Sequence, residues 1–382
     1  MAKTKLDLII EAIELPASAY ETAISRYEDL GDFLTKDSSI CKYEPQVFVQ
    51  GSFRLGTAIK PLVSKEPYDL DLTCKLTEGL SKSSITQKDF KNLVGKAIDE
   101  YIKKRGISEA KEEKRRCWRI EYQDKLSFHM DIVPGIIMED TSSLRESIMM
   151  KSNVSAHTAA EWAGLAYNIT DNKKMDYEII SDDWNISNPE GYAKWFEQRM
   201  KTSLNRSLVE ASYEKLKTFE HKSILQRCVQ ILKRHRDVMF NRELELKPAS
   251  IIITTLSGQA YNGERTVEDA ISNIVDKMGS LILRSGIRIA NPTRPEEDFT
   301  DKWKENPALE NAFNRWRMQA KADFGNIETG SDLQLIISKI NKSFSIVLNE
   351  SMFSDSILKK NINIQPHRVE IDEDPPRPHM CI

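Results

Sequence analysis

Apolar side chains recur at three- and four-residue spacing over the first forty residues, a pattern typical of amphipathic helices. The apolar positions are Leu6, Ile9, Ile10, Ile13, Tyr20, Ile24, Tyr27, Leu30 and Phe33. Pro16 interrupts the pattern. We therefore predict two helices that meet around this proline.

After Pro45 the pattern changes to short segments that are β-branched or that alternate apolar and polar residues, which favours strands. These segments read QVFVQGS, YDLDLTCKL, RRCWRIEYQ and LSFHMDIVPGI. An amphipathic stretch near residues 86–104 separates the second segment from the third. The last two segments predict a β-hairpin that turns at Gln123-Asp124-Lys125. We interpret this part of the chain as a mixed α/β module.

From about residue 190 onward the periodicity is almost wholly helical. The helical segments read GYAKWFEQRM, SILQRCVQILKRHRDVMF, ASIIITTLSGQAY, VEDAISNIVDKMGSLIL, NAFNRWRMQA and SDLQLIISKINKSFSIVL. Residues 137–189 are polar and give no clear assignment. Residues 286–306 have the proline, asparagine and charge content of a long ordered loop.

Composition indicates a soluble, cytoplasmic protein. The 382 residues are 40% hydrophobic and 30% charged, and the apolar runs are far shorter than the roughly 20 residues of a membrane span. The N-terminus lacks the pattern of a secretory signal. Five scattered cysteines without a CxxC pair indicate neither a disulfide framework nor a zinc site. The net charge of -3 argues against long nucleic acid as a substrate, although it leaves room for a local basic groove.

Two aspartates, Asp69 and Asp71, stand in one strand segment with a single residue between them. Side chains alternate along a strand, so these two carboxylates face the same side. Neighbouring carboxylates repel each other, and the pair costs stability unless a proton or a cation lies between them. On an exposed edge strand such a pair is simply solvated, so the pair alone does not identify a site.

Two further features turn this pair into a candidate site. Gly51-Ser52 follows an apolar strand and offers N–H groups and a hydroxyl to phosphate oxygens. Asp131 lies in the apolar segment LSFHMDIV, where an isolated charge is costly. The hairpin can bring Asp131 beside the other two aspartates, which creates an oxygen-ligand site suited to Mg²⁺ or Mn²⁺. Such a site serves two-metal catalysis of phosphoryl and nucleotidyl transfer.

With these residues the sequence resembles the polymerase-β-like nucleotidyltransferases, and more closely the bacterial cGAS/DncV-like enzymes (CD-NTases) that make cyclic oligonucleotide second messengers. QGSFRLGTAIKP, YDLDLT and FHMDIVP are similar to the active-site blocks of that family, and SNPEGYAKWF to its interdomain segment. ILKRHRD, SIIITTLSGQAY and IANPTRPEEDFTDKW are similar to its helical-domain signatures. The resemblance covers roughly residues 45–305.

The resemblance implies an α+β fold: a polymerase-β-like core with a mixed β-sheet, a C-terminal helical domain of the OAS/PAP-like kind, and an active site in the cleft between them. Together with the periodicity, it predicts four parts. These are N-terminal helices that pack across both lobes (1–45), the nucleotidyltransferase core (46–190), the helical domain (191–364) and a flexible C-terminal tail (365–382).

The same resemblance assigns roles to individual residues. Asp69 and Asp71 match the first two metal ligands, and Asp131 matches the third, which helps to deprotonate the acceptor hydroxyl. The turn that holds the donor triphosphate corresponds to Gln50, Gly51 and Ser52.

Lys233 and Ser250 match a lysine and a serine that contact the same triphosphate. An alternative for Lys233 is that it lies on a basic, largely solvated helix face, among Lys222, Arg227, Arg234 and Arg236.

The activity implied is the joining of NTPs, with ATP among them, into a cyclic di- or trinucleotide in anti-phage (CBASS) signalling, with two Mg²⁺ ions, or Mn²⁺, and release of pyrophosphate. Regulatory or conjugating protein partners that act on the C-terminal tail are also implied, although the ending HMCI is not diagnostic. Two alternatives stay open. One is a template-independent RNA nucleotidyltransferase of the poly(A) or CCA-adding type, and the other is an inactive nucleotide-binding partner subunit.

Overall fold

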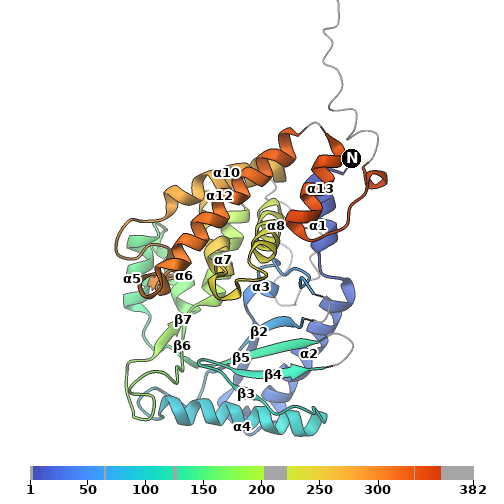
Figure 1. Ribbon diagram of the computed structural model, residues 1–382. Coiled ribbons are helices and arrows are strands. Elements are labelled where there is room, and N and C mark those ends of the chain that lie inside the picture. Colours follow the sequence, from blue (N-terminus) through green and yellow to red (C-terminus); the bar gives the residue numbers. More distant parts are fainter. Residues whose placement is uncertain (1–2, 64–65, 124–126, 202–221, 331, 354–382) are drawn as a thin grey trace, which may run out of the picture.

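The computed structural model combines a mixed β-sheet with a layer of helices packed above it (Figure 1). It describes residues 3–63, 66–123, 127–201, 222–330 and 332–353. Across these residues, no helix has the length and apolar character needed to cross a membrane. With its mixed sheet and packed helices, the fold is of the predicted α+β class.

Within the described part of the chain the sheet has seven strands, and its main path runs β1-β2-β5-β4-β3. β2 and β5 are parallel neighbours, and the other pairs are antiparallel, with β6 and β7 continuing from the end of β5. The bounds are β1 (Pro45–Val49), β2 (Tyr68–Leu76), β3 (Glu112–Glu113), β4 (Trp118–Tyr122), β5 (Phe128–Ile137), β6 (Tyr167–Ile169) and β7 (Asn185–Ser187). The predicted pairing of β4 with β5 is confirmed, while residues 124–126 of the predicted turn lie outside the described residues.

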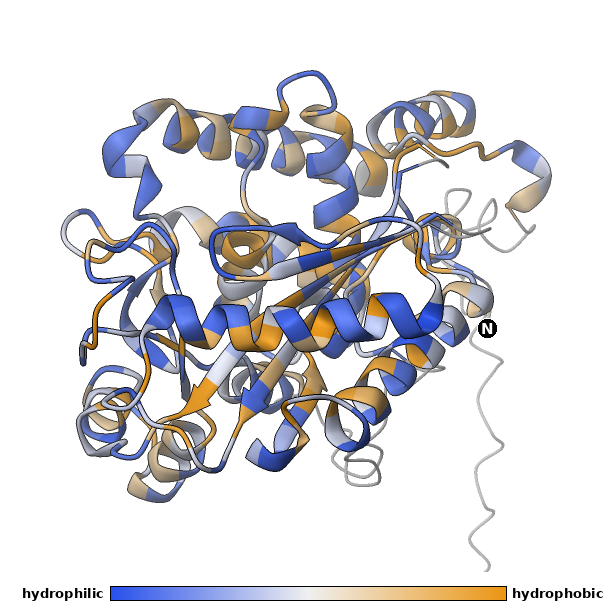
Figure 2. Ribbon diagram, turned by 90° about the horizontal axis from the view of Figure 1, so that it is seen from below, coloured by the Kyte–Doolittle hydropathy of each residue, from blue (hydrophilic) through white to orange (hydrophobic). Residues whose placement is uncertain are grey.

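One face of the sheet forms a hydrophobic core because every second residue of its central strands is apolar. Leu70, Leu72, Met130 and Ile132 are fully buried on this face. Their cluster includes residues of α2 (Ala17–Lys36) and α4 (Gln87–Arg105). Figure 2 shows α4 lying across the sheet with hydrophobic and hydrophilic residues alternating along its length. The opposite face of β2 and β5 carries the three aspartates.

The helices of the second half form a separate hydrophobic cluster. They are α7 (Pro189–Met200), α8 (Ile224–Met239), α9 (Ser250–Ala260), α10 (Val267–Leu281), α12 (Pro307–Thr329) and α13 (Leu333–Phe344). This cluster also takes in α1 (Lys5–Ile13), α5 (Ser142–Lys151) and α6 (Ala156–Gly164). The two N-terminal helices predicted around Pro16 are thus present, and they pack on different clusters.

One segment has more regular structure than the sequence indicated. Residues 286–306, predicted as a loop, form the hairpin of β8 (Ala290–Asn291) and β9 (Arg294–Asp298), followed by α11 (Lys302–Glu305). The Asp298 side chain organises this hairpin, since it accepts hydrogen bonds from the backbone of Arg288, Ile289 and Thr300. The domain boundaries stay a prediction, and the tail 365–382 lies outside the described residues.

Candidate active site between the sheet and helix α8

Three carboxylates share the polar face of the sheet. Asp69 and Asp71 lie on β2, Asp131 lies on β5, and the parallel register sets Asp71 directly beside Asp131. Residues in register on neighbouring strands point to the same side, so the strand geometry alone accounts for this grouping. The Asp69 side chain is 71% exposed, whereas Asp71 lies deeper.

The Gly51-Ser52 turn packs directly against Asp71. Gly51 begins the short helix α3 (Gly51–Arg54) with a φ of 64°, in the left-handed region. A Cβ atom on Gly51 would lie 2.2 Å from Oδ2 of Asp71, so a larger residue cannot occupy this position without displacing the carboxylate. Gln50 fixes the turn to β2, because its backbone N–H donates to the Asp71 carbonyl and its side-chain amide donates to the Leu72 carbonyl.

The environment of Asp71 disfavours its negative charge. Burial, followed by the charges of Asp131 and Asp69, raises the pKa of the Asp71 carboxyl to about 7, although Lys233 and Arg119 act in the opposite direction. No hydrogen bond to this carboxylate is found among the residues that the structure describes. The site therefore holds more negative charge than its own side chains compensate.

Arg119 on β4 neutralises the third carboxylate. Its Nε donates to Oδ1 of Asp131 and its Nη2 donates to Oδ2, both at 2.7 Å. The sequence reasoning missed Arg119, yet a signal existed, because the antiparallel register of the predicted β4/β5 hairpin sets Arg119 opposite Asp131.

These residues fit a divalent cation in donor chemistry. The half-buried, uncompensated Asp71 with two carboxylates beside it is the kind of oxygen donor set that Mg²⁺ and Mn²⁺ prefer. The convergence is incomplete: within the described ranges, no group of three or more His, Cys, Asp or Glu side chains is arranged to hold a metal ion. Asp131 is instead held by Arg119 through both oxygens.

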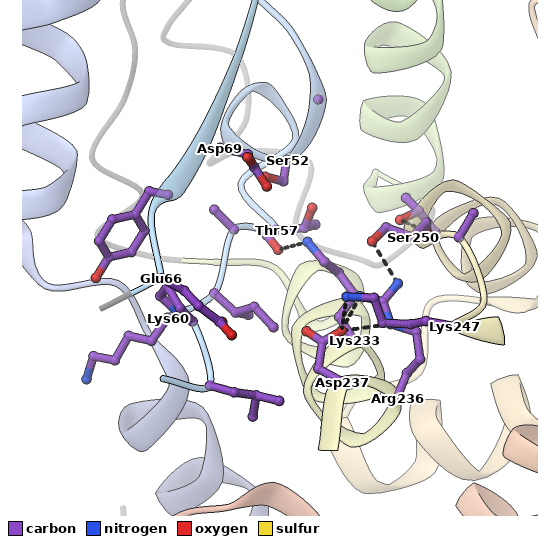
Figure 3. A pocket seen from close by; sticks show the side chains of 18 of the residues that line it. Ser52, Thr57, Lys60, Glu66, Asp69, Lys233, Arg236, Asp237, Lys247 and Ser250 are labelled. Atoms are coloured by element: carbon purple, nitrogen blue, oxygen red, sulfur yellow. Dashed lines mark hydrogen bonds and ion pairs between the residues drawn. The ribbon is translucent and has the colours of Figure 1, made fainter. Parts of the chain in front are cut away.

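A cavity of about 750 Å³ lies between this face of the sheet and the helical half. Ser52 and Asp69 line it from the sheet side, and Lys233, Arg236 and Lys247 line it from the helical half (Figure 3). Asp71 and Lys60, from β2 and from the segment that follows the Gly51-Ser52 turn, also line it. The basic lining consists of Lys60, Lys233, Arg236 and Lys247. The volume and the basic lining suit a nucleoside triphosphate.

Lys233 on α8 reaches the sheet side of this cavity. Its Nζ donates to the carbonyl of Thr57 at 2.8 Å, and the residue is only 7% exposed. Burial and then the charge of Arg236 lower the pKa of its ammonium to about 8. The alternative of a largely solvated basic face is wrong for Arg234 and Arg236, which are 4% exposed.

Ser250, the first residue of α9, lines the cavity and accepts a hydrogen bond from Arg236, which lines it as well. The Arg236 Nη1 donates to the Ser250 hydroxyl at 2.8 Å and to the Pro248 carbonyl, and its other nitrogens donate to Asp237 (Figure 3). The sequence analysis did not select Arg236, although it lies three residues after Lys233 and thus on the same side of the helix.

A row of α8 side chains holds the backbone that follows the Gly51-Ser52 turn. Each donates one hydrogen bond of 2.7 to 2.9 Å to a main-chain carbonyl. The pairs are Gln226 with Leu55, Gln230 with Ala58, Lys233 with Thr57, and Arg234 with Lys60. Buried carbonyls need partners, so this irregular segment is fixed by the helical half rather than by the sheet.

Comparisons with known proteins give consistent relatives. Residues 45–134 match the family model described as "Cyclic GMP-AMP synthase DncV-like, nucleotidyltransferase domain". A c-di-GMP synthase of Roseivirga ehrenbergii is 29% identical over an alignment of 341 residues that covers 84% of this chain and 81% of that protein.

Solved structures show that the whole fold is shared with proteins of this kind. Bradyrhizobium diazoefficiens CdnG in complex with GTP aligns with a TM-score of 0.65 and 18% identity, covering 94% of this chain and 97% of that one. CdnC from an Escherichia coli CdnC:HORMA-deltaN complex aligns with a TM-score of 0.61 and 10% identity, covering 92% and 98%. Residues 45–134 are thus similar to the DncV-like nucleotidyltransferase domain, and nearly the whole chain shares the fold of these solved structures.

Proposed function

We propose that this protein joins nucleoside triphosphates into a cyclic dinucleotide and releases pyrophosphate. The main support is one observation: a cavity of about 750 Å³ is lined at its sheet side by Asp69, Asp71 and the Gly-Ser turn, with basic side chains facing them and Asp131 in register beside Asp71. The relative from Roseivirga ehrenbergii carries the name c-di-GMP synthase, which adds support for a cyclic product. GTP and ATP are the substrates to test first.

In this proposal Asp69, Asp71 and Asp131 are the metal ligands, and Asp131 also helps to remove the proton of the acceptor hydroxyl. When bound, Mg²⁺ ions neutralise the developing charge and lower the pKa of the attacking hydroxyl. Ser52 and the backbone of Gly51 hold the donor triphosphate, while Gln50 keeps their turn fixed to β2. The acceptor ribose hydroxyl attacks the α-phosphorus in line, pyrophosphate leaves, and a second round closes the ring.

Lys233 and Ser250 bind the triphosphate from the helical side. Lys233 spends one N–H on Thr57, so two further N–H groups of its ammonium remain to donate to phosphate oxygens. Ser250 is oriented by Arg236, which lines the same cavity and is itself paired with Asp237. This arrangement supports positioning and charge neutralisation as the main sources of rate acceleration.

We also propose a cytoplasmic role in anti-phage (CBASS) signalling, with protein partners that regulate the enzyme or are conjugated to its C-terminal tail. A relevant parallel is CdnC, whose solved structure includes a HORMA protein.

The test is an incubation with labelled NTPs and Mg²⁺, followed by phosphatase treatment. A cyclic product has no terminal phosphate and survives the phosphatase, and mass spectrometry with each NTP pair identifies its bases. A product that forms only with added RNA would instead indicate an RNA nucleotidyltransferase. Binding of NTPs without any turnover would indicate an inactive subunit. Asp69→Ala with Asp71→Ala should abolish turnover, and full activity in this double variant would refute the assigned metal ligands.

A further inference from the structure

Arg119 occupies both oxygens of the one carboxylate that the proposed reaction needs as a third metal ligand. The contact is a two-pronged fork, with Nε and Nη2 each 2.7 Å from a different oxygen of Asp131. This geometry is the strongest that an arginine and a carboxylate form, and it fixes the orientation of both groups. Each Asp131 oxygen keeps a second lone pair, but the fork fixes the plane of the carboxylate and its positive charge weakens the attraction of Asp131 for a cation on the side of Asp71.

The row across the sheet explains why the fork matters. Asp71, Asp131 and Arg119 stand side by side on β2, β5 and β4, in that order, on the same face. Asp131 therefore lies between a carboxylate that repels it and a guanidinium that attracts it. Among the described residues, the hydrogen bonds of its carboxylate all come from Arg119. A cation that binds between Asp71 and Asp131 must compete with this guanidinium.

We infer that Arg119 is a positioning residue that holds Asp131 until a divalent cation replaces the guanidinium beside this carboxylate. The third metal ligand then becomes available only when substrate and metal enter together. The inference rests on the proposed function in that it takes Asp131 as a metal ligand. This exchange would benefit the enzyme in two ways. Metal alone would bind weakly, and the released Arg119 guanidinium would remain on the same face of the sheet, where its charge can contact the incoming nucleotide.

The plainer reading is a structural ion pair that never opens. Two observations favour the exchange. The side chains of Arg119 and Asp131 are 21% and 20% exposed, so water and a cation can reach the pair. The pair also lies on the polar face of the sheet beside Asp71, away from the hydrophobic core that stabilises the strands.

Metal affinity in the absence of nucleotide tests the inference. Mn²⁺ is titrated into the full chain, and free Mn²⁺ is followed by electron paramagnetic resonance, for the wild type, Arg119→Met and Arg119→Lys. Because this substitution removes a positive charge next to the cation, we expect Arg119→Met to bind Mn²⁺ on the order of tenfold more tightly than the wild type. Arg119→Lys keeps the charge but cannot form the fork, and its affinity should lie between the two.

Arg116→Met is the matched control. Arg116 is an arginine three positions earlier, and its Nε donates to Asp171 instead of to the three aspartates. This variant should bind Mn²⁺ as the wild type does. If Arg119→Met binds Mn²⁺ no better than the wild type, or if no variant binds Mn²⁺, the inference is wrong. It is also wrong if Arg119→Lys equals the wild type, because the effect would then be one of charge alone.

Thermal unfolding provides a second readout that does not depend on turnover. With a chelator present, Arg119→Met should unfold at a lower temperature than the wild type, because Asp131 and Asp71 are left without the guanidinium. Added Mn²⁺ should then raise its unfolding temperature more than that of the wild type. An equal Mn²⁺ response in both proteins would count against the exchange. Failure of the proposed function would appear separately, as the absence of a cyclic product in proteins whose Mn²⁺ affinities still follow the order expected above.

Discussion

Replacing Asp71 by asparagine should stabilise the metal-free protein, although the substitution removes a proposed metal ligand. Asparagine has nearly the same shape as aspartate, so it fits against Gly51, but it carries no charge to repel Asp131 and Asp69. The pKa of Asp71 is about 7 in the folded protein against an ordinary value of 3.8. A difference of this size corresponds to a penalty of about 4 kcal/mol on the charged form, which is an upper limit for the gain.

The gain should depend on pH in a defined way. Because the folded-state pKa is raised, the wild type loses stability as the pH rises from about 4, where the unfolded chain ionises, to about 7, where the folded protein does. Asp71→Asn lacks this loss. The difference between the two proteins should therefore be small near pH 4, grow with pH, and level off above about pH 7.

Denaturant unfolding in the presence of a chelator measures this difference at a series of pH values. Asp69→Asn is the control, because Asp69 is 71% exposed and should contribute little. Added Mg²⁺ should reverse the order, since it stabilises the wild type but not Asp71→Asn. A constant difference across the pH series, or a less stable Asp71→Asn near pH 8, would show that Asp71 is not a strained charge in the folded protein.

Three further variants test the surroundings of the site. Gly51→Ala should unfold more easily and lose Mg²⁺ affinity, because its Cβ would lie 2.2 Å from Asp71. Gly106→Ala is the control: Gly106 also has a positive φ, but its Cβ would have no atom within 4 Å, so this variant measures the cost of the backbone conformation without a clash. NTP affinity should fall as the pH rises through about 8, where Lys233 loses its proton, and calorimetry in buffers of different ionisation enthalpy should detect proton uptake on binding. Lys233→Arg should bind NTP without this pH dependence. If Lys233→Arg shows the same pH profile as the wild type, the assignment of Lys233 is wrong. Gln230→Leu should lower the free energy of unfolding by about 1–3 kcal/mol, because the buried Ala58 carbonyl loses its hydrogen-bond donor. The same variant should raise the KM for NTP more than it lowers kcat. Replacing the exposed Gln46 by leucine should change neither quantity.

The sequence by itself determined those features that follow from the periodicity of one chain segment. Alternation puts Asp69 and Asp71 on one side of a strand whatever packs around it, and three- to four-residue spacing predicts α1 and α2 on either side of Pro16. The β4/β5 pairing is also local, since only residues 123–127 separate the two strands in the sequence. These elements need no knowledge of distant contacts, because backbone geometry sets the direction of each side chain.

Only the tertiary structure decided what the basic residues of α8 do. The sequence shows a basic helix but not its partners, and the carbonyls that Gln230, Lys233 and Arg234 contact lie more than 170 positions earlier in the chain. The pKa of Asp71 likewise depends on Asp131, sixty residues away, and on burial by a turn that belongs to neither strand. Charge compensation and burial are sums over neighbours in space. A linear pattern can therefore propose the three acids, whereas the packing of the sheet against α8 sets their environment.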